Sequence, residues 1–337
     1  MAGLVSIICT TYNEEKLIEK TLNSFLAQKL DNMSSEILVV DGMSEDRTRE
    51  IVKSFERKYS NIRLIDNPER KNPFGRNKGI EEAKGEYIAM LGAHTVYADE
   101  YVKICIEEMA RTDSIGVSGK VITSTDSLNE NSLNESSNEA QLCGLILTSK
   151  FGVSGSSFRT VKEGYTSMVN FPVFKKEVFK IVGLYNTSLH RNQDNDFNQR
   201  VIKNNYKLYN TWKTQCFYYP SNTFKGIFSY AYNNGFWNAK SLKQNSESMK
   251  IHHYVPFIFV ATLIIMGLFS VAGLMINSLL QTALFIFVIA LHLLTGLFFS
   301  LTIEKYRTVK NILSLPFLFF AFHFTYGWGT LRGFFSK

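Results

Sequence analysis

The chain has 337 residues, of which 45% are hydrophobic and 20% are charged, with a formal net charge of +7. This length accommodates one large domain, or one domain with an appendage. The basic excess is concentrated at one end, because residues 251–337 carry five Lys or Arg and one Glu, which leaves +3 for the first 250 residues. We therefore expect no basic face of the kind that binds nucleic acid.

Residues 3–120 alternate between strand-like and helix-like segments. The patterns LVSIIC, EILVVD, NIRLID and GEYIAML each read as a strand followed by a helix, and SIGVSG closes the series. This alternation predicts an α/β fold with a mostly parallel sheet and helices on both faces. The first strand exit, TTYNEE, lacks G-x-G-x-x-G, which disfavours a dinucleotide-dependent enzyme. The predicted helices are Glu14–Gln28, one starting at Ser44–Glu45, Arg76–Ala83 and Ala98–Arg111.

The second half of the chain is less regular. Residues 123–139 are polar and nearly repetitive, which predicts a mobile loop. TSMVNFPVFKKEVF indicates a strand leading into a helix, DNDFNQRVIKNN indicates a helix, and residues 206–219 indicate short edge strands. Residues 1–223 are thus expected to form one domain. Aromatic-rich Phe224–Lys243 predicts an amphipathic helix at a membrane surface, within an interface and linker segment of residues 224–250.

Residues 251–337 are predicted to form a membrane region with two or three helices. Val255–Ile276 and Leu279–Ile303 contain no charged residue, and each exceeds the roughly 20 residues that a spanning helix needs. Ile312–Trp328 is close to the lower limit, and Pro316 is expected to kink it. Basic residues before the first run and after the second place both of these ends on the cytoplasmic side. They are Lys240, Lys243, Lys250, Lys305, Arg307 and Lys310.

Polar residues follow three of the predicted strands at the points where those strands end. Residues 11–14 follow the first strand, Asp41 follows the second and His94 follows the fourth. Open α/β sheets bind ligands at this edge. The four cysteines lack metal spacing and are expected to be reduced and mostly buried.

Four segments together carry a family resemblance: SIICTTYNEE, ILVVDGMSEDRT, GRNKGIEEAKGEYIAML and RNQDNDFNQR. The chain resembles the inverting nucleotide-sugar glycosyltransferases of family 2, and most of all the bacterial succinoglycan-type exopolysaccharide transferases. This resemblance implies a GT-A fold followed by a membrane tail. It also implies a nucleotide diphosphate-sugar donor, a polyprenyl-linked or growing glycan acceptor, and a role in exopolysaccharide or capsule synthesis. The expected location is a bacterial cell membrane, with the catalytic domain cytoplasmic and in contact with membrane lipid.

The resemblance also implies roles for donor-binding residues. Thr11, Tyr12 and Glu14 would shape the nucleoside pocket, and Asp41 would hydrogen-bond the base, usually uracil, which makes UDP the expected nucleotide. Asp41 is alternatively a cap on the following helix. Two further residues, Arg76 and Asn77, fall where the family contacts nucleotide or diphosphate, although Arg76 is alternatively a solvated residue of the first helical turn.

His94 falls where family members usually have the last acid of D-x-D, which binds Mn²⁺ or Mg²⁺ on the diphosphate. The exopolysaccharide branch often has D-A-H, and this chain departs further because Gly92 replaces the first acid. Three interpretations of His94 stay open: a metal ligand, a direct contact to the diphosphate, or a structural residue at the rim of the sheet. Imidazole suits Mn²⁺ better than Mg²⁺. The replacement of D-x-D by Gly92-Ala93-His94 leaves metal dependence open.

Inverting transfer needs a base that takes the proton of the acceptor hydroxyl. The family places a Glu-Asp pair at the start of a helix, and in this chain the corresponding residues are Gln193 and Asp194. By resemblance Asp194 is the catalytic base, and it is alternatively the N-cap of that helix. Asp196 is expected to interact with the helix dipole.

Three further residues are candidates for diphosphate or acceptor contacts. Arg159 and Arg191 are either such contacts or ordinary surface arginines. Trp237 either stacks on an acceptor sugar or anchors the chain at the membrane interface. The absence of a full Q-x-x-R-W motif indicates addition of a single sugar. Two alternative functions stay open: a catalytically degenerate nucleotide-sugar-binding scaffold of a polysaccharide assembly complex, and a small transporter, which the uncharged spans disfavour.

Overall fold

The computed structural model describes residues 3–124, 137–153, 162–189, 191–244, 251–276 and 278–336. Most of the expected polar loop, residues 125–136, lies outside the described residues, as does Arg159. The chain divides into two compact units. Unit 1 comprises Met1–Ser124 and Phe158–Pro220, and unit 2 comprises Thr125–Ser157 and Ser221–Lys337.

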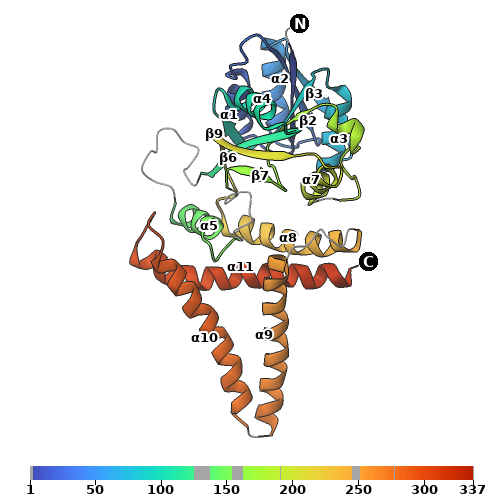
Figure 1. The fold of residues 1–337 in the computed structure, drawn as a ribbon. Coiled ribbons are helices and arrows are strands. Elements are labelled where there is room, and N and C mark those ends of the chain that lie inside the picture. Colours follow the sequence, from blue (N-terminus) through green and yellow to red (C-terminus); the bar gives the residue numbers. More distant parts are fainter. Residues whose placement is uncertain are drawn as a thin grey trace. The chain divides into compact units, whose positions relative to one another are not determined.

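The described part of unit 1 is built around a single mixed sheet (Figure 1). The strand order is β3-β2-β1-β4-β8-β6-β9-β5, with β7 also paired to β9. The first four strands along this order are parallel, and β8 is antiparallel to both of its neighbours. The strands are β1 (Leu4–Thr11), β2 (Ser34–Asp41), β3 (Ile62–Asp66), β4 (Tyr87–Gly92), β5 (Thr95–Tyr97), β6 (Gly116–Thr123), β7 (Gly164–Thr166), β8 (Val173–Lys175) and β9 (Leu208–Tyr218).

Helices cover both faces of this sheet, as the sequence predicted. Alternate residues of β1 point to opposite faces, so Ile7 lies in one hydrophobic cluster and Ile8 in the other. The Ile7 cluster includes residues of α1, α2 and α4, and the Ile8 cluster includes residues of α3, α6 and α7. The helices are α1 (Ile18–Leu26), α2 (Thr48–Lys58), α3 (Asn72–Glu82), α4 (Tyr101–Thr112), α6 (Val178–Ile181) and α7 (Gln193–Lys203). The four cysteines are buried and free.

Two details of the sequence prediction are wrong. Residues 206–219 do not form short edge strands, because β9 is a single strand of 11 residues that pairs with β6 on one side and with β5 and β7 on the other. The first two helices also begin later than predicted, at Ile18 and Thr48. The polar residues that looked like helix caps near Ser44 instead bond the loop after β1, as described below.

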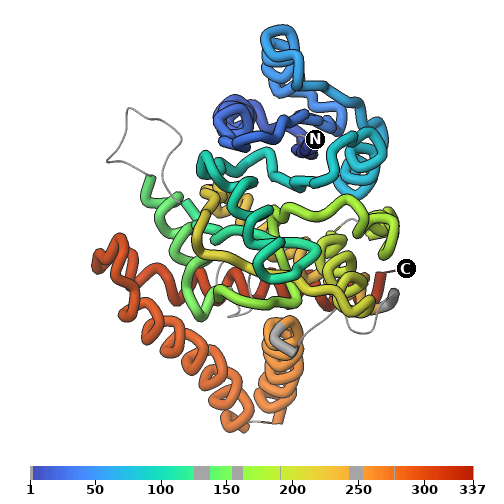
Figure 2. Tube along the Cα trace, turned by 45° about the horizontal axis from the view of Figure 1, so that its top comes forward, coloured from blue at the N-terminus to red at the C-terminus, as the bar shows by residue number. Residues whose placement is uncertain are grey.

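Unit 2 is helical in its described residues. It contains α5 (Asn138–Thr148), α8 (Phe224–Gln244), α9 (Ile251–Met275), α10 (Leu280–Leu301) and α11 (Val309–Phe335). Three stretches are long and apolar enough to cross a membrane: His253–Met275, Leu280–Leu301 and Val309–Phe335. The third helix is longer than the predicted run and continues through Pro316. The helices α9 and α10 converge at their turn and form a hairpin (Figures 1 and 2).

Candidate functional site

The strand register of unit 1 brings the predicted strand-end residues together. Thr11 at the end of β1 lies opposite Asp41 at the end of β2. On the other side of β1, Thr10 lies opposite Gly92 at the end of β4. Because these strands are parallel, their carboxyl ends form one edge, and the polar residues that follow them share that edge.

The loop after β1 is held by side chains from the segment that follows β2. The N–H of Asn13 donates to the Ser44 hydroxyl, and the N–H of Glu14 donates to the Thr48 hydroxyl, each at 2.8 Å. Asn13 has a positive φ of 55° and its amide oxygen accepts from the N–H of Glu45 at 2.9 Å. These bonds fix the loop and leave the Tyr12 side chain 43% exposed at the site.

Asp41 is fully buried and its carboxylate is occupied from within the chain. It accepts from the N–H and the hydroxyl of Ser44, at 2.9 and 2.6 Å, and from the Arg49 guanidinium at 2.8 Å. Arg49 also bonds Asp66 at 2.7 Å, and these two carboxylates raise the pKa of Arg49. Asp41 is not the cap of the next helix, since α2 begins seven residues later, at Thr48. Its carboxylate holds the turn at Ser44.

The His94 imidazole pairs with the Glu14 carboxylate. The distance between His94 Nδ1 and Glu14 Oε1 is 3.0 Å. A carboxylate only accepts hydrogen bonds, so Nδ1 carries the proton, and in the neutral ring the Nε2 lone pair is left for a ligand. The backbone around His94 is fixed by the Thr21 hydroxyl, which donates to Ala93 O at 2.9 Å, and by the N–H of Tyr219, which donates to His94 O at 3.1 Å.

Gly92, which stands where the family has an acid, lies against an aromatic ring. A Cβ at Gly92 would come within 2.8 Å of Phe171 Cε1. The Phe171 ring contacts Tyr97 and Tyr218, with centroid distances of 6.1 and 6.0 Å, and Tyr101 donates to Phe171 O at 2.8 Å. Phe171 thus occupies the space that a longer side chain at position 92 would need.

Asp194 forms an ion pair with Arg76, which joins α7 to α3. The Arg76 side chain is only 17% exposed and lies 4.9 Å from the centroid of the Tyr185 ring. Burial disfavours the charged guanidinium, but the charge of Asp194 more than offsets this and the pKa of Arg76 is raised. Arg76 is therefore not a solvated residue. Asp194 is not the N-cap of α7 either, since Asn192 occupies that position.

Hydrogen bonds also join the start of α7 to β1 and α3. Gln193 Nε2 donates to Asn72 Oδ1 at 3.2 Å, and Asn72 Nδ2 donates to the Thr10 hydroxyl at 3.0 Å. Asn77 exchanges two hydrogen bonds of 2.9 Å with the backbone of Tyr185. The Asn77 amide therefore positions Tyr185, and its contact with the donor stays a prediction. Asp196 lies in the first turn of α7 and pairs with Arg200 at 3.1 Å.

Three predicted residues take no part in the contacts described above. Arg191 precedes α7 and is half-buried. Trp237 belongs to α8 in unit 2, where its ring packs on Phe236 with a centroid distance of 5.5 Å. Arg159 lies outside the described residues. The roles of these three residues stay predictions.

Sequence reasoning missed several residues of the site. Ser44 lies in DGMSEDRT, where its position indicated a helix start, and Arg49 follows directly after that motif. Phe171 and Tyr185 carry no motif, because their contacts with Gly92 and Arg76 join distant parts of the chain. A small hollow in unit 1 was also missed, and there Lys120 Nζ lies 4.7 Å from the centroid of the Trp212 ring. It is lined by Ser118, Gly119, Lys120, Val121, Asn170, Asn210 and Trp212.

Two known proteins are similar to this chain over most of its length. The dolichyl N-acetyl-alpha-D-glucosaminyl phosphate 3-beta-D-2,3-diacetamido-2,3-dideoxy-beta-D-glucuronosyltransferase of Methanococcus voltae is 29% identical over 340 residues, covering 98% of this chain and 97% of that protein. Succinoglycan biosynthesis protein ExoA of Rhizobium meliloti (strain 1021) is 26% identical over 258 residues, covering 76% of this chain and 74% of that protein.

A solved structure shares the fold. Mannosyltransferase PcManGT from Pyrobaculum calidifontis, in complex with GDP-Man and Mn²⁺, aligns with a TM-score of 0.62 at 16% identity, covering 100% of this chain and 88% of that one. The predicted GT-A fold is confirmed. Residues 6–176, just over half of the chain, match the family described as Glycosyl transferase family 2. The chain belongs to that family and is a glycosyltransferase.

Proposed function

We propose that this enzyme moves one sugar, with inversion, from a UDP-sugar to a polyprenyl-linked glycan acceptor at the cytoplasmic face of a membrane. Two relatives support this proposal by name: one acts on a dolichyl phosphate-linked sugar, and one belongs to succinoglycan synthesis. The apolar helices of unit 2 suit an acceptor that is itself embedded in lipid. Confining enzyme and acceptor to one surface raises their effective concentration.

The observation that carries the proposal is the pairing of Asp194 with Arg76 at the edge of the sheet. The Asp194 carboxylate is 38% exposed, so an acceptor hydroxyl can reach it. In the proposed step the hydroxyl oxygen attacks the anomeric carbon from the face opposite the leaving group. The bond from that carbon to the diphosphate oxygen breaks, the hydroxyl proton passes to Asp194, and the nucleoside diphosphate departs.

The same pairing would make catalysis depend on the donor. The Arg76 guanidinium is bonded to Oδ1 of Asp194, so an incoming hydroxyl finds one oxygen of this carboxylate already occupied. The donor diphosphate is anionic and would compete with Asp194 for Arg76. A guanidinium group binds phosphate oxygens in the same bidentate way as it binds carboxylate oxygens. Donor binding would thus draw Arg76 away and leave Asp194 free to accept a proton.

His94 fits a divalent metal as a single protein ligand. Its Nδ1 is bonded to Glu14, which is the usual way in which a metal-binding imidazole is oriented. Within the described ranges no group of three His, Cys, Asp or Glu residues could hold an ion. The other ligands would have to be diphosphate oxygens and water. Bound Mn²⁺ or Mg²⁺ would stabilise the negative charge that develops on the departing diphosphate.

The nucleoside would lie against the loop after β1. The exposed Tyr12 ring offers a stacking surface, and Thr11 lies in register beside Asp41. Because the Asp41 carboxylate already accepts three hydrogen bonds, a base contact would have to use its remaining acceptor capacity at Oδ2.

The test is to incubate the detergent-purified full chain with a panel of nucleotide sugars and a short polyprenyl-phosphate-linked sugar, with and without Mn²⁺. Release of nucleoside diphosphate together with formation of a longer lipid-linked glycan is expected for one donor. Asp194→Asn should bind that donor but form no product, while Asp196→Asn should stay active. Turnover by Asp194→Asn would show that Asp194 is not the base. Turnover on soluble glycans alone would show that the acceptor is not lipid-linked.

A further inference from the structure

Within unit 2, α8 and α11 lie side by side along much of their length (Figure 1). Glycines allow their backbones to approach closely, since a Cβ at Gly235 would meet Tyr326 O and a Cβ at Gly329 would meet Tyr232 O. A Cβ at Gly333 would likewise meet the Phe236 carbonyl. The contacts of Tyr232 with Gly329 and of Phe236 with Gly333 advance by four residues on each helix, so the two helices are parallel and the orientation of one fixes that of the other.

The helix α8 is too polar to enter the hydrocarbon of a bilayer. It carries Lys225, Lys240 and Lys243 and has exposed Ser229, and it is not one of the three apolar candidates. Charged side chains inside the hydrocarbon of a bilayer are costly. If α11 crossed the membrane, its parallel partner would be carried in with these three lysines. The packing therefore argues against α11 as a third span.

The composition of α11 agrees with this argument. Its mean hydropathy is 1.2, against 2.5 for α9 and 2.4 for α10. It also contains Asn311, Ser314, Thr325 and Arg332, whereas α9 and α10 have no charged residue within their candidate spans. A helix of lower hydropathy that carries polar and charged residues suits the plane of a membrane surface better than the hydrocarbon.

One face of α11 is an exposed apolar stripe. Its members follow at helical intervals of four and seven residues, and all are large apolar side chains with exposed fractions between 38% and 82%. Leu315, Phe319 and Phe322 lie on the opposite face and are buried in the cluster with α5 and α8. We call the exposed set the α11 stripe: Val309, Leu313, Phe317, Phe324, Trp328 and Phe335.

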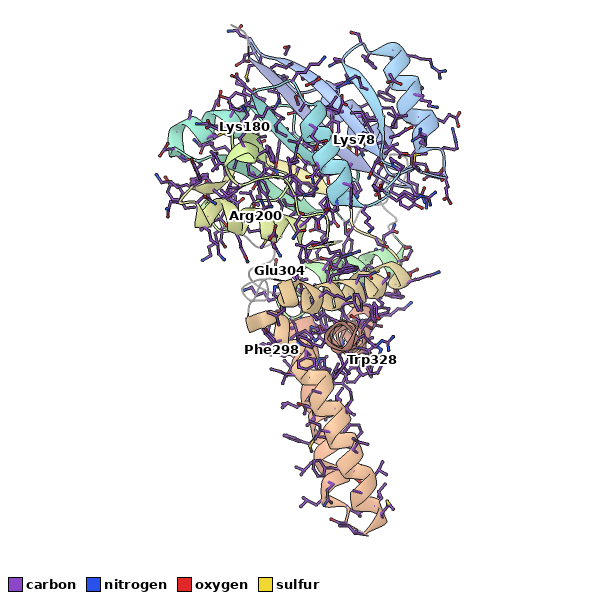
Figure 3. The ribbon with its side chains drawn as sticks, turned by 90° about the vertical axis from the view of Figure 1, so that its right-hand side faces the viewer. Lys78, Lys180, Arg200, Phe298, Glu304 and Trp328 are labelled. Carbon is purple, nitrogen blue, oxygen red and sulfur yellow. The ribbon has the colours of Figure 1, made fainter. Side chains whose placement is uncertain are left out.

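The two spans contact α11 on its side, between the buried face and the exposed stripe. Gly327 is packed against Pro256 of α9, and Gly296 of α10 is packed against Pro316. Figure 3 looks nearly along α11 and shows α9 and α10 extending away from it, on the side opposite α8, with Trp328 labelled on α11 and Phe298 on α10. The spans thus meet α11 at positions 327 and 316, each next in sequence to a member of the α11 stripe, Trp328 and Phe317.

We propose that α9 and α10 are the only two spans among the described helices, and that α11 lies along the membrane surface with its stripe in the leaflet that these spans enter. The occupant of the stripe is lipid, because the stripe continues the lipid-facing surface of the spans. The loop of residues 302–308, with exposed Lys305 and Arg307, lies on the same side of the membrane as the end of α11.

Depth measurements distinguish the two orientations. Single-tryptophan chains would be made in a Trp212→Phe, Trp237→Phe, Trp328→Phe background by adding Leu313→Trp, Phe317→Trp or Phe324→Trp, alongside a chain that keeps only Trp328. Quenching by brominated lipids of known depth is then measured in vesicles. An in-plane helix gives one shallow depth at all four positions. A spanning helix gives a gradient of about 22 Å from residue 313 to residue 328, at 1.5 Å per residue, and that gradient would overturn the proposal.

Two controls complete this experiment. Phe319→Trp, on the face packed against α8, should be quenched weakly, whereas Phe298→Trp on α10 should be quenched strongly. Absence of quenching along the stripe, with Phe298→Trp still quenched, would show that protein covers the stripe and would also overturn the proposal.

Sidedness gives an independent test. Cysteines introduced as Ser336→Cys, Lys305→Cys and Ser278→Cys are labelled with a membrane-impermeant maleimide in sealed vesicles of known orientation. The four native cysteines are buried, so the unmodified chain measures the background. Positions 336 and 305 should label from one side and position 278 from the other. Labelling of 336 from the side of 278 would make α11 a span and refute the proposal. Neither experiment depends on the sugar donor, so a failure here is distinct from a failure of the proposed function.

Discussion

Arg76 donates to the Asp194 carboxylate although 118 positions separate the two residues in the chain. This contact joins the middle of α3 to the first turn of α7. We expect Asp194→Asn to lower the transfer rate by about 10²–10⁴-fold, because the amide cannot accept the acceptor proton. Donor affinity, measured by calorimetry, should be retained or raised, because the donor diphosphate no longer competes with a charged Asp194 for Arg76. The matched control is Asp196→Asn two positions later, which removes only the pair with Arg200 and should keep most of the activity.

Glu14→Gln tests how His94 is oriented. The amide cannot hold the Nδ1 proton of His94 as a carboxylate does, so the ring is less firmly set for a ligand at Nε2. We expect Mn²⁺ affinity in the presence of UDP, followed by electron paramagnetic resonance, to fall about 10-fold or more. Glu15→Gln is the control, since Glu15 Oε2 only accepts from the N–H of Arg47. Equal Mn²⁺ binding by the Glu14→Gln and control chains would remove the orienting role.

Restoring the family acid at position 92 should fail in this chain. In Gly92→Asp the new side chain meets the Phe171 ring, and such overpacking costs about 1–3 kcal/mol of unfolding free energy. Phe171→Ala should relieve that cost, so the double variant is expected to be more stable than the sum of the single changes predicts, by more than about 0.5 kcal/mol. Denaturant titration of the solubilised chain, followed by tryptophan fluorescence, measures the unfolding free energy of the parent chain, the two single variants and the double variant. Strict additivity would mean that the two side chains do not compete for space.

Arg49→Met should destabilise unit 1. It leaves the fully buried Asp41 carboxylate without its cation and also removes the bond to Asp66. The expected loss is about 2–3 kcal/mol. Arg47→Met is the comparison, because the Arg47 side chain is 73% exposed, and it should change stability by less than about 0.5 kcal/mol. The same denaturant titration measures both losses of unfolding free energy. Similar losses in the two variants would contradict the role of Arg49 in stabilising the buried Asp41 carboxylate.

Glu108 should give unit 1 an acid-sensitive component of stability. Hydrogen bonds from Arg111, and then from Lys213, lower the pKa of this carboxyl against the opposing effect of burial. Because its folded pKa is below the unfolded value of about 4.3, the stabilisation is complete above that value and is lost as the pH falls through the folded pKa. Glu108→Gln should therefore lower the midpoint of thermal unfolding at pH 7 and have a smaller effect near pH 3. A constant difference across this range would contradict the prediction.

The strands of the first half were predictable because their apolar runs are short and end at polar residues. Ile37 to Val40, for example, form a continuous buried run that ends at Asp41. The same logic placed Asp41 and His94 at one edge of the sheet, since parallel strands end together. Family likeness, rather than periodicity, then singled out Arg76 and Asp194.

The late starts of α1 and α2 were not predictable from local sequence. Ser44, Asp46 and Thr48 have the composition of a helix start, but they accept hydrogen bonds from the N–H groups of residues 13, 15 and 14 respectively. Helix-start rules treat such side chains as partners of their own helix, so bonds across more than 30 positions escape them. The contacts of Phe171 with Gly92, and of Tyr185 with Arg76, escaped prediction for the same reason.

The parallel packing of α8 and α11 has a consequence for biosynthesis. The groove around Gly235 is complete only when residues 326–330 arrive, almost a hundred positions later, and the α9–α10 hairpin is synthesised in between. While the ribosome is still making the hairpin, α8 has no partner for this surface. Closure by α11 therefore comes after the hairpin has been made, and chains interrupted before it would expose an uncovered helix to chaperones and proteases.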